Sequence, residues 1–110
     1  MRPTVRITQP GSMKVVNYAT YTPVPEKVAA LRPAHREYMT RLLTDGRLVA
    51  CGPFADGSGA LFIYEADDIS TARSLAEADP YTLGGVIKQQ TITPWTLVYS
   101  NPGLLQQPEG

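Results

Sequence analysis

The 110-residue chain has a single cysteine, a single histidine and no excess of charge of either sign. One cysteine, Cys51, excludes a disulfide within the chain and any metal site built from several cysteines. Ten Lys and Arg residues balance ten Asp and Glu residues, so the composition offers no electrostatic footprint for nucleic acid or for an anionic membrane surface. The lack of net charge also leaves self-association unopposed.

Long apolar runs are missing as well. No stretch approaches the ~20 apolar residues that a membrane-spanning helix requires. The basic residues near the N-terminus are not followed by the apolar segment of a secretory signal. We therefore expect a cytoplasmic protein that has neither nucleic acid nor a membrane as its partner.

The sequence does contain enough apolar material for one core. Apolar residues make up 43% of the chain and charged residues 18%, and a chain of this length fits a single domain. Both ends are rich in turn-forming residues. We expect a flexible N-terminal extension at 1–12, a folded domain over 13–100 and a C-terminal tail at 101–110, whose Leu104 and Leu105 are suited to docking on the domain or on a partner.

The first half of the domain changes from strand periodicity to helix periodicity. Alternating apolar residues at 13–21 predict a strand. Pro25 is suited to opening a short helical piece, and Pro33 to the first turn of a longer helix over 33–45. In that helix, four residues fall on one face at spacings of three and four: His35, Tyr38, Met39 and Leu42.

The second half predicts a hairpin, a helix and a last strand. Residues 47–54 and 60–66 flank the Asp-Gly pair of a tight turn. Two aspartates then cap a helix that ends near Asp79, because Pro80 cannot continue it. The last strand spans 86–100, with Pro94 marking a bend, a bulge or a sheet edge.

The order β-α-β-β-α-β predicts an α+β fold of the ferredoxin-like, split βαβ type. Its antiparallel four-stranded sheet carries both helices on one face. The other face is built from small and apolar residues, and a second copy of the chain is the natural cover for it. We therefore expect a homodimer in which two sheets face each other as a dimeric α/β barrel.

His35 is the first candidate for a functional group. Histidine is the one side chain whose ordinary pKa lets it take and give protons near neutrality. A lone histidine on an apolar helix face is more often a hydrogen-bonded core residue, however. Position alone therefore favours a structural role for His35.

Asp79 is the second candidate, in the sequence EADPY at the end of the second helix's inner face. A carboxylate buried there must be paired or strongly hydrogen-bonded. One interpretation is that Asp79 only hydrogen-bonds the turn through Tyr81, as Asp commonly does before Pro. The other is that Asp79 meets His35, since both helices lie on one sheet face, and then fixes the tautomer of the imidazole and raises the basicity of its free nitrogen.

Three further residues are candidates for substrate binding. Arg32, directly before Pro33, is suited to holding an anionic substrate group, although an arginine at a helix entrance is at least as often merely solvated. Tyr38 and Trp95 are suited to lining an apolar pocket, although aromatic residues at such spacings are more often ordinary core.

Other chemistries find little support in the sequence. Ser58 lies in a turn and Cys51 in a strand, and neither is clearly placed as a nucleophile. One histidine with scattered carboxylates does not make a metal ligand set. The glycine-rich segment 52–59 lacks the context of a dinucleotide site and the lysine of a P-loop. We therefore expect no metal and no cofactor, and a proton-transfer dyad rather than an acyl-enzyme.

Together, four segments resemble the YCII-related family of the dimeric α/β-barrel group: RPAHREYMTRLLTDGRLVACGPF, DGSGALFIYEAD, ARSLAEADPY and ITPWTL. The similarity covers about residues 13–99. It depends on the combination of three individually weak motifs: R-x-x-H, G-x-L-x-x-x-G-P and A-D-P-[YF]. The resemblance implies a ferredoxin-like dimer with a site centred on His35 and Asp79, and Arg32 matches the motif arginine.

The resemblance also implies proton-transfer chemistry. A member of this family acts as a dehydrochlorinase on a chlorinated hydroxyquinol, and the wider fold group includes muconolactone isomerase and small monooxygenases. We expect an isomerase, lyase or dehydrochlorinase-like enzyme whose partner is a small cyclic or aromatic-derived substrate. Because a fold does not fix a function, two alternatives stand beside it: a non-catalytic dimeric ligand-binding or accessory module, and a cofactor-free monooxygenase.

Overall fold

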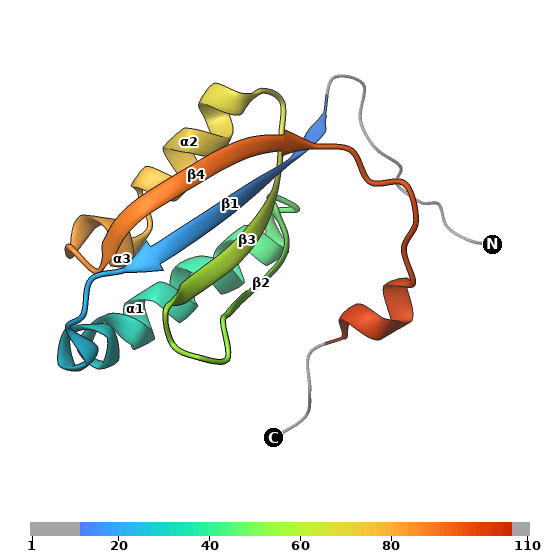
Figure 1. The fold of residues 1–110 in the computed structure, drawn as a ribbon. Coiled ribbons are helices and arrows are strands. Elements are labelled where there is room, and N and C mark those ends of the chain that lie inside the picture. The colour runs from blue at the N-terminus through green and yellow to red at the C-terminus, as the bar shows by residue number, and fades with distance from the viewer. Residues whose placement is uncertain (1–11, 107–110) are drawn as a thin grey trace.

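The structure is a computed structural model that describes residues 12–106. Four strands form one antiparallel sheet in the order β2-β3-β1-β4. Their bounds are β1 Met13–Tyr21, β2 Leu48–Pro53, β3 Gly59–Ala66 and β4 Ile87–Trp95. The helices are α1 Pro25–Thr44, α2 Ile69–Glu77 and α3 Pro80–Leu83, followed by a 3-10 turn, η1, at Pro102–Leu105. All three α-helices lie behind the same face of the sheet (Figure 1), which confirms the predicted ferredoxin-like arrangement.

The core lies between this sheet face and the helices. Along the two central strands every second residue is buried against the helices, because successive side chains of a strand point to opposite faces. The helices supply the other half of the core. The larger members are Val15, Met39, Leu42, Leu48, Phe62, Tyr64 and Leu75.

The β2–β3 hairpin forms as the Asp-Gly pair predicts. Gly57 has a φ of 76°, a left-handed conformation that glycine adopts without a steric penalty. The Asp56 carboxylate accepts a hydrogen bond from the Ser58 amide at 2.9 Å and so closes the turn through its own side chain.

The first helix differs from the prediction, because it begins at Pro25 and continues through Pro33. A proline inside a helix removes one backbone hydrogen bond and usually kinks the helix. Here the turns before Pro33 are held by packing: Leu31 lies directly against Gly84 at the end of α3, where any larger residue would overlap it. Tertiary contact therefore overrides the local preference.

The second helix also ends earlier than predicted. α2 stops at Glu77, and Asp79 is the N-cap of the separate helix α3 rather than the last residue of α2. Pro80 explains both facts, since proline cannot extend a helix but is favoured at the first position of a new one. The segment after Pro80 is helical to Leu83.

The last strand ends at Trp95 instead of continuing to residue 100. β4 is an edge strand of the sheet, and this is where a proline such as Pro94 is tolerated. The expected flexible extension falls, apart from Ser12, outside the described residues, and so do residues 107–110 of the tail. No helix within residues 12–106 is long and apolar enough to cross a membrane.

The sheet face away from the helices carries the alternate set of residues. Strand alternation and register place four apolar residues of the two central strands there: Val16, Tyr18, Leu61 and Ile63. Tyr18 is 51% exposed, and its ring contacts that of Phe54 at 5.1 Å between centroids. We call the surface formed by Val16, Tyr18, Leu61 and Ile63 the open face.

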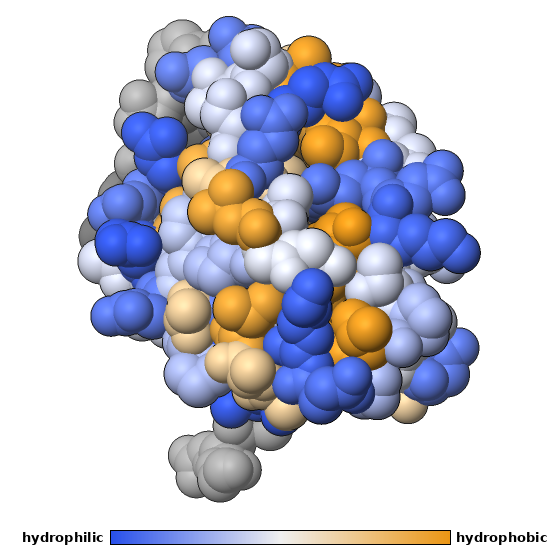
Figure 2. Space-filling model, turned by 90° about the vertical axis from the view of Figure 1, so that its left-hand side faces the viewer, coloured by the Kyte–Doolittle hydropathy of each residue, from blue (hydrophilic) through white to orange (hydrophobic). Residues whose placement is uncertain are grey.

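The flank of the molecule has a different character. Figure 2 views the side at which α3 and the first turns of α1 lie, and its apolar residues form separate patches divided by polar groups. Leu83 of α3, 74% exposed, is the kind of isolated apolar side chain that soluble proteins commonly show. On the open face, by contrast, the four apolar residues stand in two directly opposed pairs, Val16 with Ile63 and Tyr18 with Leu61.

Gly59 at the start of β3 provides a test of the sheet geometry. A Cβ atom at this position would overlap the backbone of Ala19 on β1, so Gly59→Ala must push the two central strands apart. We expect a loss of about 1–3 kcal/mol in the free energy of unfolding, measured by urea denaturation. The control is Gly52→Ala on β2, where nothing lies within 4 Å of the new atom and the change is expected to stay within about 0.5 kcal/mol. Equal stability of the two variants would contradict the close approach at Gly59.

Candidate active site

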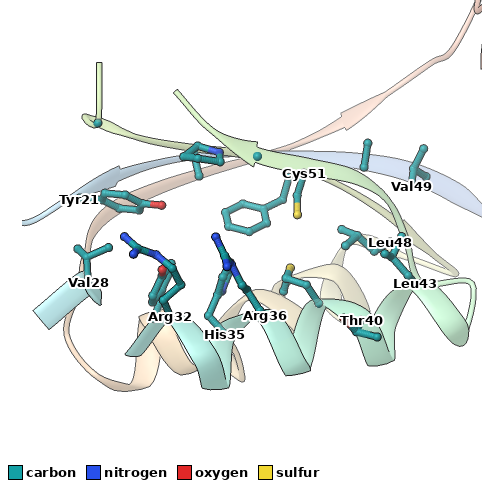
Figure 3. A pocket seen from close by; sticks show the side chains of 18 of the residues that line it. Tyr21, Val28, Arg32, His35, Arg36, Thr40, Leu43, Leu48, Val49 and Cys51 are labelled. Atoms are coloured by element: carbon teal, nitrogen blue, oxygen red, sulfur yellow. The ribbon is translucent and has the colours of Figure 1, made fainter. Parts of the chain in front are cut away.

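A cleft of about 1270 Å³ opens between α1 and the edge strand β2, and His35 lies on its floor. Figure 3 shows side chains of α1 and of the sheet pointing into it from opposite walls. η1 borders the cleft through Leu104 and Leu105, which nonetheless remain 82% and 61% exposed. The tail leucines therefore reach the cleft without packing closely on the domain.

The structure brings His35 and Asp79 together. His35 Nδ1 lies 2.8 Å from Asp79 Oδ1, within hydrogen-bonding distance. An ionised carboxylate can only accept, so Nδ1 carries the hydrogen and donates it. Nδ1 is thereby occupied, and Nε2 is the ring nitrogen that remains for a ligand in the cleft.

Two aromatic rings fix the plane of the imidazole. Tyr81 stacks on His35 with ring centroids 3.9 Å apart and an angle of 7° between the planes. Phe62 meets the imidazole edge-on at 5.9 Å. The ring is therefore held by a carboxylate at one edge and by aromatic groups on its sides, which leaves it little freedom to rotate.

Asp79 itself is 2% exposed and is held by a second donor. Its Oδ1 atom accepts a hydrogen bond from the Tyr81 amide at 2.9 Å, the N-cap interaction that begins α3. Asp79 therefore makes both of the contacts that the sequence suggested: it closes the turn through Tyr81 and it contacts His35. At the N-terminus of α3, the helix dipole favours the carboxylate instead of opposing it.

Tyr38 lies outside the cleft and links two helices instead. Its hydroxyl donates a hydrogen bond to the carbonyl oxygen of Leu75 near the end of α2, at 2.8 Å. Thr82 makes a similar link, donating from its hydroxyl to the Ala76 carbonyl at 2.8 Å. The first bond holds α2 against α1, the helix that carries His35, and the second holds α3 to α2 at the junction that carries Asp79.

Trp95 lies elsewhere too, contrary to its expected place in the pocket wall. It pairs with Lys14 across the sheet, on the side of the open face, and is 43% exposed. The sheet itself separates the indole from His35. Trp95 lies three residues after Ile92, whose side chain packs on the core, so strand alternation places the indole on the opposite face, and the sequence alone contained this signal.

Arg32 lines the cleft, and Arg36 lines it as well. Arg36 is not one of the four residues that the sequence places on the inner face of the helix. Both arginines point from α1 toward the sheet, on either side of His35 (Figure 3). The reason is that α1 lies beside the sheet edge, so a wider arc of the helix faces the cleft than its buried stripe suggests.

Tyr21 was not singled out in the sequence, yet it faces Arg32 across the cleft. Burial, the neighbouring Tyr81 and the charge of Asp79 raise the pKa of Tyr21 to about 12. The group is therefore a neutral phenol near neutral pH and can donate a hydrogen bond to a ligand.

Cys51 projects from β2 into the cleft opposite α1 (Figure 3). Although the residue is exposed in the single chain, desolvation of its sulfur, followed by the charge of Asp79, raises the pKa of the thiol to about 11. Nucleophilic catalysis needs the thiolate, so this environment works against such a role. Within residues 12–106 no three His, Cys, Asp or Glu side chains are grouped to hold a metal ion.

The family of the chain follows from comparison with known proteins. A model of the YCII-related domain matches residues 13–96. The chain belongs to the YCII-related domain family. This YCII-related domain is 36% identical over 63 residues to the uncharacterized protein YjpA of Bacillus subtilis, covering 57% of this chain and 73% of YjpA. It is 31% identical over 84 residues to protein YciI of Escherichia coli O6:H1, covering 67% of this chain and 86% of YciI.

Among solved structures, the YCII-related domain is similar to 5-chloro-2-hydroxyhydroquinone dehydrochlorinase (TftG) from Burkholderia phenoliruptrix AC1100. The TM-score is 0.68 at 22% identity, and the match covers 76% of this chain and 94% of the other. The likeness shows that the two proteins share a fold.

The raised pKa of Cys51 gives a direct prediction. Near pH 8 only a small fraction of the thiol is ionised, so the folded protein should react with iodoacetamide about a hundredfold more slowly than an ordinary cysteine. Mass spectrometry at timed intervals measures the rate. The same chain unfolded in urea is the control, in which the ordinary rate returns. Equal rates in the folded and unfolded chain would contradict a desolvated thiol.

Proposed function

We propose that this protein is a small-molecule enzyme in which His35 and Asp79 carry out proton transfer on a small cyclic or aromatic-derived substrate. The observation that carries the proposal is the 2.8 Å contact between His35 Nδ1 and Asp79 Oδ1 at a cleft that reaches the imidazole. Isomerisation and elimination, including loss of chloride, are the reaction types that suit such a pair.

His35 acts as the general base through Nε2. With Nδ1–H donated to Asp79, the lone pair of Nε2 faces the ligand and takes a proton from substrate carbon or hydroxyl. The resulting imidazolium is stabilised by the buried carboxylate. In an isomerisation the proton returns to another substrate atom, whereas in an elimination a leaving group departs with its electron pair and the proton passes on to solvent.

Arg32 is the residue that we assign to holding a substrate anion. Its guanidinium lies beside His35 in the cleft and faces the neutral Tyr21 hydroxyl (Figure 3). A guanidinium binds a carboxylate or phenolate oxygen by charge-assisted hydrogen bonds. An anion held there would stand next to the reacting nitrogen.

A purely structural His–Asp pair is the competing interpretation, and the shape of the cleft argues against it. A structural pair needs no access, whereas His35 lines an open cleft together with two cationic side chains. The substrate class takes support from TftG, a dehydrochlorinase whose structure holds 2,5-dihydroxybenzoquinone, a small oxygenated ring. Transfer of that chemistry to this chain is part of the proposal.

We also propose that two copies associate through the open face. Tyr18 and its neighbours Val16, Leu61 and Ile63 are too apolar to favour contact with water, and the described helices all cover the opposite side. The zero formal net charge removes a barrier to this association. Each copy keeps its own cleft, because the cleft lies on the helical side.

The catalytic proposal is tested by turnover. We expect the wild type to release chloride from a chlorinated hydroxyquinol, or to exchange substrate hydrogen for deuterium from D₂O in a lactone or hydroxylated aromatic. His35→Gln should lower the rate by about 10²–10⁴-fold, because the general base is lost. Ion chromatography and NMR measure the two reactions.

Two further variants complete this experiment. Asp79→Asn keeps an oxygen for the Tyr81 amide but removes the charge behind His35, so its rate should lie below that of the wild type. Arg73→Gln, on the exposed side of α2, is the control and should match the wild type. If His35→Gln turns over as fast as the wild type, or if a folded wild type leaves every compound in these classes unchanged, the non-catalytic module becomes the better interpretation.

The dimer proposal has its own measurement. Ile63→Asp places a charge in the middle of the open face, and burying it against a second copy carries a penalty of several kcal/mol. Sedimentation should show twice the mass of one chain for the wild type and a shift to single chains for the variant. Leu83→Asp, on α3, is the matched control and should stay dimeric. A wild type that sediments as one chain at micromolar concentration would rule out the dimer.

A further inference from the structure

The charge of the cleft differs from that of the chain. Positive and negative residues are equal in number over the whole sequence, yet two arginines and no Asp or Glu stand among the described residues that line the cleft. The two arginines are Arg32 and Arg36. Asp79 lies behind His35, buried and already accepting two hydrogen bonds. The wall that a ligand meets is therefore cationic.

Neither guanidinium is neutralised within the described part of the chain. The ion pairs found in residues 12–106 are Lys14 with Glu65 and His35 with Asp79, and neither involves these arginines. Tyr21 and Cys51, the weakly acidic side chains among the described residues of the cleft, add no negative charge at neutral pH. A phenol and a thiol are ordinarily protonated there, and the surroundings raise their pKa values further, to about 12 and about 11. Both positive charges are available to a ligand.

The spacing of the two arginines defines a ligand geometry. Arg32 and Arg36 are four residues apart on α1, slightly more than one helical turn, so a rise of about 6 Å along the axis separates them. His35 lies between them in sequence, and all three point toward the sheet (Figure 3). A comparable distance separates two substituents at opposite positions of a six-membered ring. The facing wall includes the ring of Phe62 and the neutral thiol of Cys51, which suit a flat ligand.

We propose that the cleft binds a small planar dianion whose two anionic groups lie across a ring, one held by Arg32 and the other by Arg36. Arg36 is then a second specificity-determining residue, which the sequence pattern did not indicate. The inference rests on the proposed function in placing the ligand beside His35. It adds that a substrate with one anionic group binds less tightly than one with two groups at this spacing.

Isothermal titration calorimetry with terephthalate, phthalate and benzoate tests the spacing. Terephthalate carries two carboxylates across the ring, phthalate carries two on adjacent carbons, and benzoate carries one. We expect terephthalate to bind the wild type at least about tenfold more tightly than benzoate, because each charge-assisted hydrogen bond to a guanidinium adds about that factor. Phthalate should fall between them, since its total charge is right and its spacing is wrong.

Variants then locate the effect. Arg36→Gln should reduce terephthalate affinity to the benzoate level, and Arg36→Lys should keep part of it as a point charge. Arg73→Gln removes the same charge from α2, away from the cleft, and should bind as the wild type does. Thermal unfolding of each variant establishes that it is folded.

Several results would overturn the inference. They are unchanged terephthalate binding by Arg36→Gln, equal loss in Arg73→Gln, equal affinity for phthalate and terephthalate, or no binding of any probe by the wild type. Because calorimetry measures binding without turnover, the outcome is independent of proton transfer. If His35→Gln binds terephthalate but neither the wild type nor any variant shows turnover, the proposed function is refuted. The dianion site would still stand in that case.

Discussion

The buried carboxylate of Asp79 is the constraint on which the arrangement of the site depends. A charge that is 2% exposed must be compensated by donors at close range, or the fold loses several kcal/mol. The two donors come from different parts of the chain: the Tyr81 amide from α3 and the His35 ring from α1. Satisfying one carboxylate therefore requires that α1 and α3 lie in contact.

Other contacts act in the same direction. Tyr38 bonds to the Leu75 carbonyl and so ties α1 to the end of α2, one helical turn along from His35. Gly84 has no side chain to keep Leu31 away, which lets the N-terminal half of α1 approach α3. The position of His35 is thus determined by three separate links to the α2–α3 junction. A preorganised base needs such redundant contacts. An imidazole free to rotate would lose the hydrogen bond that keeps the proton on Nδ1, and its Nε2 lone pair would no longer point at the substrate.

The sequence predicted the fold and the central pair, and it failed where neighbours outweigh local preference. Periodicity and the Asp-Gly pair were sufficient for the four strands, because sheet alternation is a short-range signal. The pattern did not show that α1 runs through Pro33, since the compensation comes from Leu31 packing on a residue 53 positions away. It also did not indicate that Arg36 reaches the site, because the spacing of apolar residues identifies the buried stripe of a helix but not a cleft beside it. Tyr38 and Trp95 were predicted to line the pocket because they are aromatic. Tyr38 instead contacts α2, and strand alternation places Trp95 on the other face of the sheet.

The two faces of the sheet have different roles, and one irregularity in β2 determines which of its residues stands opposite Phe62 of β3. Between Leu48 and Cys51, β2 advances three residues while β3 advances two, from Tyr64 to Phe62. After this bulge, each side chain of β2 points to the sheet face opposite to the one it would occupy in a regular strand. In a regular ladder Ala50 would stand opposite Phe62 on the helical face; with the bulge, Cys51 stands there instead. A single inserted residue in β2 therefore places Cys51 beside Phe62 in the wall of the cleft opposite α1. The central strands keep their alternation, and with it the separation between the cleft and the open face.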